Sequence, residues 1–295
     1  MNSVIMSLNK NQLSWILFIS LSFIYGSAFI LIKWGLISYS PQQVASYRIF
    51  IGGIALSPLA FGIRKISLSK SQWYFLIQSG VLGSLIPAFL FASAEQHLDS
   101  GITSVIGSVM PVFTVLISYF AFQYKIGKLQ ILGLALAISS VLLIGLNETS
   151  STGLQWKGVV YILTAALCYA ANMNFIKFKL DGIPPKIISS VSLLFLIIPT
   201  GFILFQNGFF EGIRNPENLR SLLSLTFLGL TSTALALLLF IKLLKIANPL
   251  FTSSITFAVP IVALIWGLFD GEKIGSQESA AIVLMMFGIW LISKK

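Results

Sequence analysis

The sequence predicts an all-α integral membrane protein with ten transmembrane helices, arranged as two five-helix repeats of inverted topology with both termini in the cytoplasm. Three observations lead to this prediction: an apolar composition, ten apolar segments of membrane-spanning length, and a match between the two halves of the chain. Hydrophobic residues make up 56% and charged residues 9% of the 295 positions, and the mean hydropathy is +0.92. Charged residues are about 25% of an average soluble protein, so a water-soluble globule is excluded.

The first predicted element is an apolar helix that begins near residue 13, and nine similar segments follow. A bilayer is crossed by about 20 apolar residues. The first segment exceeds the apolar core of a signal peptide, so we expect it to remain as a helix. A β-barrel is excluded because barrel strands alternate apolar and polar residues, whereas LFISLSFIYGSAFILI is apolar on every side. The ten predicted spans are 13–34, 41–61, 72–94, 101–123, 129–146, 157–177, 186–206, 220–244, 249–269 and 277–293.

Basic residues are divided unequally between the predicted connections on the two sides of the membrane. With the N-terminus in the cytoplasm, thirteen lysines and arginines fall on the inner side and five on the outer side. Eight of the nine acidic residues fall on the outer side. Cytoplasmic connections are enriched in Lys and Arg, and a count of nine or eleven spans would reverse half of this pattern. The net charge of +10 is therefore a topology signal, and we expect no nucleic-acid partner.

The two halves of the chain match at nearly constant shifts. YGSAFILIK, which starts at Tyr25, and YAANMNFIK, which starts at Tyr169, share Tyr, Ile and Lys at a shift of 144 residues. TSVIGSVMPVFTVLI and TSSITFAVPIVALIW align Pro111 with Pro260 at a shift of 149. Ordered matches of this kind predict a duplicated chain.

The expected repeats are residues 1–149, with helices 1 to 5, and residues 150–295, with helices 6 to 10. Because each repeat holds an odd number of helices, the second must face the membrane in the opposite direction. Inverted repeats of this kind build alternating-access carriers, with the binding site near the midplane. The architecture thus favours a secondary transporter.

These same segments resemble the EamA branch of the drug/metabolite transporter superfamily. The resemblance rests on EQHLDSGITSVIGSVMPVFTVLI, on ANPLFTSSITFAVPIVALIWGLFDGE, and on YGSAFILIK before a helix that begins with proline. It implies ten helices, cytoplasmic termini, export or exchange of small metabolites such as amino acids, and a place in the cell membrane, as in a bacterial inner membrane. The sequence departs from the family pattern at one point. The acidic residue that often ends the fourth helix of a repeat is present as Glu272 but is replaced by Gln123 and Tyr124 in the first half.

Arg48 is the only charge that we place well inside a predicted span. A charge there costs about 2.5–3.5 kcal/mol on insertion scales, so such residues face a bundle interior or a cavity. Its counterpart in the second repeat is Ser192. Three interpretations remain open: Arg48 binds a substrate carboxylate, it marks one side of a gate, or it serves a structural role by capping carbonyl groups or pairing with a neighbouring helix. Together with Arg48, the residues predicted to bind substrate are Tyr25, Ser27, Ser108, Tyr169, Asn172, Asn174, Thr231, Thr256 and Trp266.

Paired prolines and a few titratable residues complete the candidate set. Pro111 and Pro260 each remove a backbone hydrogen bond inside a span, and their repetition predicts hinges, although proline is tolerated generally in membrane helices. Glu95, His97 and Glu272 are candidate proton sites at the outer helix ends. The alternative for Glu95 and His97 is that they are merely solvated, and for Glu272 that it is an outer gate or an ordinary charge at a helix end.

An enzyme is the least supported class. One Cys, one His and nine acids supply no nucleophile–base pair, metal cluster or paired carboxylates, and no nucleotide-binding loop is present. We expect no catalytic residue, metal or cofactor, and the lipid bilayer and a small molecule as partners; the oligomeric state is left open. The leading prediction is an exporter of amino acids or related amphiphiles. The alternatives are a drug or other metabolite efflux permease, and a non-transporting receptor or assembly factor.

Overall fold

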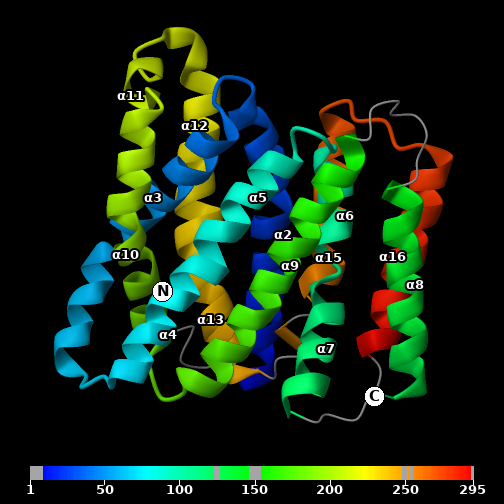
Figure 1. Ribbon diagram of the computed structural model, residues 1–295, viewed down its shortest axis with the longest axis horizontal. Coiled ribbons are helices and arrows are strands. Elements are labelled where there is room, and N and C mark those ends of the chain that lie inside the picture. Colours follow the sequence, from blue (N-terminus) through cyan, green and yellow to red (C-terminus); the bar gives the residue numbers. More distant parts are fainter. Residues whose placement is uncertain (1–8, 123–126, 146–153, 248–250, 253–254, 294–295) are drawn as a thin grey trace.

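The computed structural model describes residues 9–122, 127–145, 154–247, 251–252 and 255–293. Within these residues the protein is helical and contains no strand. Seven helices are long and apolar enough to cross a membrane, and three shorter apolar helices accompany them. The helices run roughly side by side in an elongated bundle (Figure 1). The prediction of an all-α membrane protein is confirmed at this level.

Within the described residues the predicted spans fall on helices, three of them with a local break, and residues 123, 146, 249, 250, 253 and 254 of these spans lie outside the described residues. The elements of the first half are α2 (Lys10–Leu36), α3 (Pro41–Ala60), η1 (Phe61–Lys65), α4 (Lys70–Gly80), η2 (Val81–Leu85), α5 (Ile86–Ala94), α6 (Ser100–Gly107), α7 (Met110–Phe122) and α8 (Lys128–Gly145). Those of the second half are α9 (Leu154–Lys179), α10 (Pro185–Gln206), α11 (Phe209–Gly212), η3 (Pro216–Asn218), α12 (Leu219–Phe227), η4 (Leu228–Leu235), α13 (Ala236–Ile246), α15 (Ile255–Phe269) and α16 (Ser276–Ser293).

Polar residues just before the apolar runs fix where several helices begin. The side chains of Asn9, Ser40 and Ser69 accept hydrogen bonds from the first turns of α2, α3 and α4, and a Gln three residues later completes a capping box in each case. Such caps satisfy backbone N–H groups that have no partner inside the helix. Proline opens α3 and α10, where its missing N–H costs nothing.

Three of the predicted spans are interrupted near their middle. The third contains the π-helical turn η2 and the eighth contains the longer π-helical stretch η4. The fourth is divided into α6 and α7, which are separated by Ser108 and Val109 just before Pro111. π-Turns often mark functional sites, and proline interrupts the helical hydrogen bonds before it. The interruptions lie around a common central region.

The bundle is organised around α2, which packs against α12, α13 and α15. Small residues allow the closest approaches: a Cβ on Gly26 of α2 would lie within 2.9 Å of the Val259 carbonyl oxygen of α15. Helices α8 and α16 pack against each other at one side of the bundle (Figure 1). There a Cβ on Gly288 would lie within 2.8 Å of the Gly133 carbonyl oxygen, as expected for helices joined through small residues.

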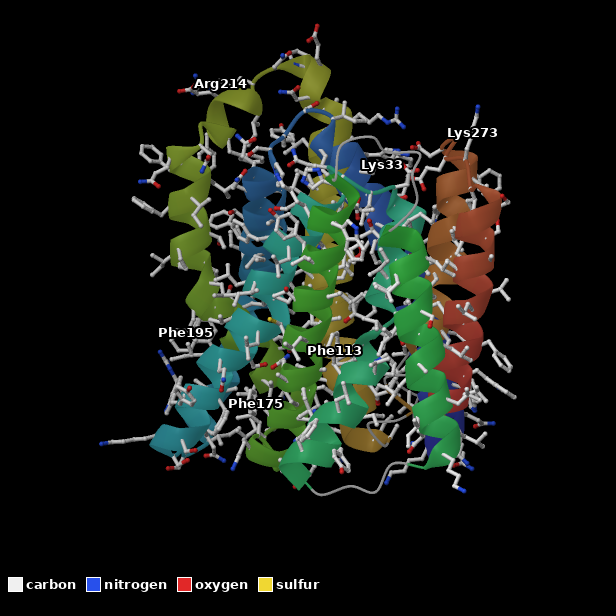
Figure 2. All side chains as sticks on the ribbon, turned by 45° about the vertical axis from the view of Figure 1, so that its right-hand side comes forward. Lys33, Phe113, Phe175, Phe195, Arg214 and Lys273 are labelled. Carbon is white, nitrogen blue, oxygen red and sulfur yellow. The ribbon has the colours of Figure 1, made fainter. Side chains whose placement is uncertain are left out.

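The two ends of the bundle are named here by the predicted orientation. The outer end carries the connections 37–40, 95–99, 207–218 and 270–275, and the inner end carries the connections 61–69 and 180–184. These groups lie at opposite ends of the helices (Figure 1). Lys33, Arg214 and Lys273 lie toward the outer end in Figure 2, whereas Phe175 lies toward the inner end.

Candidate substrate-binding cavity

A cavity lies in the middle of the bundle and is bordered by both halves of the chain. Its volume is about 160 Å³, counted as the space open to the centre of a water-sized sphere. A single water needs roughly 10–15 Å³ in that measure, so the cavity has room for a small organic molecule. The lining comes from α2, α3, η2, α5, α6, α7, α9, η4, α13 and α15, together with Ser108 and Thr252. All three interrupted spans contribute to it.

Arg48 is held at the cavity wall by the close approach of α3 and η4. A Cβ on Gly229 of η4 would lie within 3.0 Å of the Arg48 carbonyl oxygen, so only glycine permits this contact. One turn further along η4, the hydroxyl of Thr233 accepts a hydrogen bond from Nε of Arg48 at 3.0 Å. The hydrogen bond links the first half of the chain to the second.

Arg48 is the one charged side chain among the described residues that line the cavity. The hydrogen bond to Thr233 uses one of the five N–H donors of the guanidinium group. Within the described ranges no carboxylate forms an ion pair with it. A buried cation without a carboxylate partner is expensive. An anionic group in the cavity would supply the missing partner.

Aromatic side chains form much of the remaining wall. The Tyr25 ring lies 6.4 Å from the Phe240 ring, and the Phe91 ring lies 5.7 Å from Phe29 and 6.1 Å from Tyr169, measured between centroids. All five side chains border the cavity. Tyr25 and Tyr169 are the pair that the repeat aligns at a shift of 144. The cavity thus combines one cation with an amphipathic aromatic wall, which suits a ligand with an anionic group and an apolar body.

Six of the ten residues predicted to bind substrate line the cavity: Tyr25, Arg48, Ser108, Tyr169, Asn172 and Thr256. The other four do not border it. Trp266 donates a hydrogen bond from Nε1 to the Ser27 hydroxyl at 3.0 Å, and this bond joins α15 to α2. Asn174 and Thr231 each bond to a carbonyl oxygen of their own helix, at 2.8 and 2.7 Å.

The sequence interpretation missed several lining residues. They include Phe29, Phe91 and Phe240, as well as Ser84 of η2. The sequence does carry a signal for one of them. Phe29 lies four residues after Tyr25 and so falls on the same helix face, which also carries Ile32 at the cavity. Phe91 and Phe240 have no such marker, because 24 phenylalanines are spread along the chain.

An ion-paired network lies at the outer end of the bundle, beyond the cavity. Nζ of Lys33 lies 2.7 Å from Asp270 and 2.9 Å from Glu272. The same Glu272 carboxylate accepts hydrogen bonds from the Ser100 N–H at 3.1 Å, the Ser100 hydroxyl at 2.6 Å and the Gly101 N–H at 3.1 Å. Asp270 also accepts a hydrogen bond from the Trp34 indole at 2.8 Å. The network therefore joins α2, α6 and the connection that follows α15.

The two acids of this network are held ionised by their partners. Burial by itself raises the pKa of Glu272, but the hydrogen bonds from Ser100 and Lys33 outweigh it and leave that pKa below its ordinary value. Burial likewise raises the pKa of Asp270, and the hydrogen bonds from Lys33 and Trp34 bring it below its ordinary value. Hydrogen bonds and a nearby cation favour the charged form of a carboxyl.

Glu95 and His97 lie in the connection between α5 and α6. Both carboxylate oxygens of Glu95 are buried and make no hydrogen bond with the described residues, and the same holds for Nδ1 of His97. Burial raises the pKa of Glu95 well above its ordinary value, and the nearby Glu272 carboxylate adds to this effect. The His97 ring stacks on Tyr161, with centroids 6.3 Å apart. Of the three candidate proton sites, Glu95 and Glu272 therefore occupy contrasting environments.

The paired prolines occupy different local structures. Pro111 follows the break between α6 and α7, whereas Pro260 lies inside the continuous helix α15. Val259, the residue before Pro260, and Met110, the residue before Pro111, both line the cavity. The two prolines thus flank the cavity, and only the first accompanies an interruption in the described residues.

Comparison with protein families places the chain with membrane transporters. The model of the EamA-like transporter family matches residues 12–146 and again residues 156–294. Two consecutive matches of similar length correspond to the two halves of the chain. Together they cover nearly all of the sequence.

Individual relatives cover nearly the whole chain as well. The uncharacterized transporter YoaV of Bacillus subtilis is 27% identical, and the alignment covers 92% of this chain and 94% of YoaV. A probable amino-acid metabolite efflux pump of Salmonella typhimurium is 25% identical, with 91% of this chain and 90% of the relative covered. The uncharacterized inner membrane transporter YedA of Escherichia coli is 23% identical, with 93% and 88% covered.

The fold also occurs in a solved crystal structure. That structure superimposes with a TM-score of 0.64 over 94% of this chain and 95% of its own, at 14% sequence identity. At this identity the likeness establishes the fold alone.

Proposed function

The chain belongs to the EamA-like transporter family, and we propose that it is a secondary transporter that exports amino acids or related small amphiphiles. Membership makes it a multi-pass membrane transporter of the kind whose relatives include bacterial inner membrane proteins. The proposal adds the substrate class and an alternating-access mechanism through the central cavity. It involves no chemical reaction, metal or cofactor.

The proposed architecture is ten transmembrane helices in two inverted repeats, residues 1–149 and 150–295. The seven long and three shorter apolar helices among the described residues support this number. The two separate family matches, which divide between residues 146 and 156, support the division into repeats. Both halves contribute to the cavity wall, as expected for a carrier whose site lies at the repeat interface.

The observation that carries the substrate class is Arg48. It is buried at the cavity, it is bonded to Thr233 through one donor, and no carboxylate of the described protein pairs with it. A substrate carboxylate would accept two parallel hydrogen bonds from a guanidinium group. The rings of Tyr25, Tyr169, Phe29, Phe91 and Phe240 would then contact the apolar part of the substrate. The name of the Salmonella relative, an amino-acid metabolite efflux pump, agrees with this class.

The break before Pro111 is proposed to act as a hinge. Ser108 and Val109 separate α6, which is bonded to the outer network, from α7, which packs against α9. A hinge absorbs its motion in a few residues at the end of a helix. Movement of α7 relative to α6 would open one side of the cavity while the other stays closed.

Counterflow in proteoliposomes tests the proposal. Vesicles that contain purified protein are loaded in turn with each unlabelled amino acid, and a trace of labelled compound is added outside. We expect saturable accumulation with at least one amino acid. Arg48→Gln should weaken the apparent affinity for carboxylates by about 10–100-fold, since a hydrogen bond to a charged group contributes roughly 1.5–3 kcal/mol. An amino-acid amide, which has no carboxylate, should lose far less.

Arg64→Gln is the matched control, because Arg64 is exposed on η1 at the inner end. It should transport like the wild type. Equal losses of carboxylate and amide transport in Arg48→Gln would assign Arg48 a structural role. If the folded wild type showed no counterflow with any amino acid, the substrate class would be rejected and efflux of cationic or neutral metabolites would be favoured. If those metabolites gave no counterflow either, a non-transporting role would be favoured.

A further inference from the structure

We propose that Lys33, Asp270 and Glu272 form a latch that closes the outer end of the cavity, and that the chain carries such a latch at this end only. The proposal rests on the proposed alternating-access transport, but its test does not require a substrate. The latch joins three elements that border the cavity: α2 through Lys33, α6 through Ser100 and Gly101, and α15 through the connection at its end.

The latch lies directly beyond the cavity on each element. On α2 the neighbouring residue Ile32 lines the cavity, and on α6 the cavity begins with Ser104, one turn after Ser100. On α15 the cavity ends at Val259, and the Ser27–Trp266 hydrogen bond lies between it and Asp270. A solute that enters from the outer side between these elements would have to separate them.

Glu272 does more than pair with a lysine, because it also caps α6. The side chain of Asp99, the N-cap residue, makes no capping hydrogen bond. The Glu272 carboxylate instead accepts the Ser100 and Gly101 N–H groups. Free N–H groups and the helix dipole favour a negative charge at this position. Closing the outer end thus satisfies the start of α6, and opening it would leave these groups without their acceptor.

Two glycines provide the space that Glu272 occupies. A Cβ on Gly267 would lie within 2.3 Å of Glu272 Oε2, and a Cβ on Gly101 would lie within 3.3 Å of the same atom. The Glu272 side chain is 5% exposed. The carboxylate is therefore enclosed between α6 and α15, where its interactions are screened by water much less than those of a surface ion pair.

The repeat-related positions at the inner end lack the acids. Lys33 corresponds to Lys177 at the shift of 144, whereas Asp270 and Glu272 correspond to Ala121 and Gln123 at the shift of 149. Gln123 lies outside the described residues, so this comparison is one of sequence. The first half of the chain supplies a lysine to the latch and the second half supplies both carboxylates. The reverse arrangement, in which the second half supplies the lysine and the first half supplies both carboxylates, is not found in the sequence.

Accessibility of a cavity cysteine from the outer side tests the latch. Cys168, the single native cysteine, is replaced by Ser, and Ser104→Cys places a thiol at the cavity just inside the latch. Intact cells are treated with a small, negatively charged, membrane-impermeant methanethiosulfonate, and the labelling rate is measured. Glu272→Gln should raise this rate by about tenfold or more, because a buried charge-assisted contact that holds the outer end closed is lost. Asp270→Asn should raise it less.

Asp181→Asn is the matched control, because Asp181 pairs with Lys245 at 3.3 Å at the inner end. It should leave the labelling rate unchanged. Size-exclusion chromatography and thermal unfolding verify that each variant is folded, and Asp270→Asn provides a milder change if Glu272→Gln is unstable. Equal labelling in wild type and both latch variants would overturn the proposal. So would an equal increase in Asp181→Asn, which would indicate general loosening. Accelerated labelling without any amino-acid transport would keep the latch and reject the substrate class.

Discussion

The outer and inner ends of the bundle carry different kinds of ion pair in the residues that the structure describes. At the outer end, Glu272 is enclosed and receives three hydrogen bonds from α6 and one from Lys33. At the inner end, the ion pair that the structure describes joins Lys245 to Asp181, whose side chain is 81% exposed. Exposed pairs contribute little. We therefore expect enclosure of the carboxylate and capping of α6 to hold the outer end more firmly than an exposed ion pair holds the inner end.

The same comparison separates two uses of a lysine at a helix end. Lys33 and Lys177 occupy matching positions in the two aligned segments, and a lysine at the end of a span commonly extends to the lipid headgroups. The structure gives Lys33 two carboxylate partners. The difference between the two ends thus arises from two acidic positions after α15, and not from the lysines.

Removal of the Glu272 carboxylate should have the largest effect on the difference between the outer and inner ends. Glu272→Ala leaves Lys33 with one acid and the start of α6 without its acceptors. Loss of one partner of a buried pair costs roughly 3–5 kcal/mol, so we expect a fall in the unfolding temperature of several degrees. Asp181→Ala at the inner end should leave it unchanged. Equal shifts in the two variants, measured by thermal unfolding in the same detergent, would contradict the contrast.

A glycine substitution should break the latch without changing any charge. A Cβ in Gly267→Ala would lie within 2.3 Å of Glu272 Oε2 and would displace the carboxylate. Overpacking of this kind costs about 1–3 kcal/mol. We expect the outer labelling of the Ser104→Cys thiol to rise in this variant. Gly107→Ala, where a Cβ would have ordinary contacts at 3.4 Å, is the control for unfolding temperature, which should fall only in Gly267→Ala.

The pH on the outer side should affect closure through Glu95 and Glu272 in opposite ways. Protonation of Glu95 favours the closed outer end, whereas protonation of Glu272 weakens it. Burial and the negative charge of Glu272 raise the pKa of Glu95 well above its ordinary value, and the positive charges of Arg48 and Lys33 offset this only in part. An ordinary hydrated Glu has a pKa of about 4.3. At pH values between this ordinary pKa and the raised pKa, Glu95 keeps its proton when the outer end is closed. It would release that proton if the outer end opened and water reached the carboxyl. Opening is therefore favoured as pH rises through this window, by up to tenfold per pH unit.

The lowered pKa of Glu272 acts in a different range. Its contribution to closure is present above the ordinary pKa and is lost only as pH falls through the lowered value. Labelling of the Ser104→Cys thiol rises with pH in every variant, because the thiolate is the form that reacts. With Glu95 present, the rate should rise more steeply than this as pH increases above the ordinary pKa of Glu. Glu95→Gln, which mimics the protonated carboxyl, should keep only the pH dependence of the thiol itself. A pH profile that Glu95→Gln does not alter would exclude Glu95 as its source.

The smallest expected effect comes from adding an acid to the inner end. Gln123→Glu places a carboxylate in the first half at the position that corresponds to Glu272 in the second half. If the repeat places it near Lys177, closure of the inner end should gain about 1 kcal/mol or less, as for a single exposed pair. The labelling rate of the Ser104→Cys thiol in inside-out vesicles should fall by up to about fivefold. An unchanged rate would show that the inner end lacks the enclosure that makes the outer pair effective.

Arg48 and the tyrosine pair show what part of the site is readable from sequence. A charge inside an apolar span must face a protein interior, so the sequence alone predicts that Arg48 lies at a bundle interior or a cavity. The repeat alignment singles out Tyr25 and Tyr169. All three residues line the cavity. Their position could be anticipated because the cost of burying a charge, and a match between two segments of the sequence, do not depend on details of packing. That they bind substrate stays a prediction.

Ser27, Trp266 and Asn174 show where such reasoning stops. A polar group in a membrane helix must find a hydrogen-bond partner, but a cavity, a neighbouring helix and its own helix satisfy it equally well. Trp266 and Ser27 bond to each other, and Asn174 bonds to the preceding turn. Their polarity is informative, but the rotation of each helix about its axis decides which partner they meet.

By itself the sequence determined that this protein lies in a membrane, that it is helical, that its two halves carry matching segments and that a single arginine lies among apolar residues. These properties follow from composition, periodicity and charge, which act on each segment separately. Only the tertiary structure decided that Glu272 caps α6, that glycines make room for it, and that Phe91 and Phe240 reach the cavity. Each of these depends on how helices distant in sequence pack together.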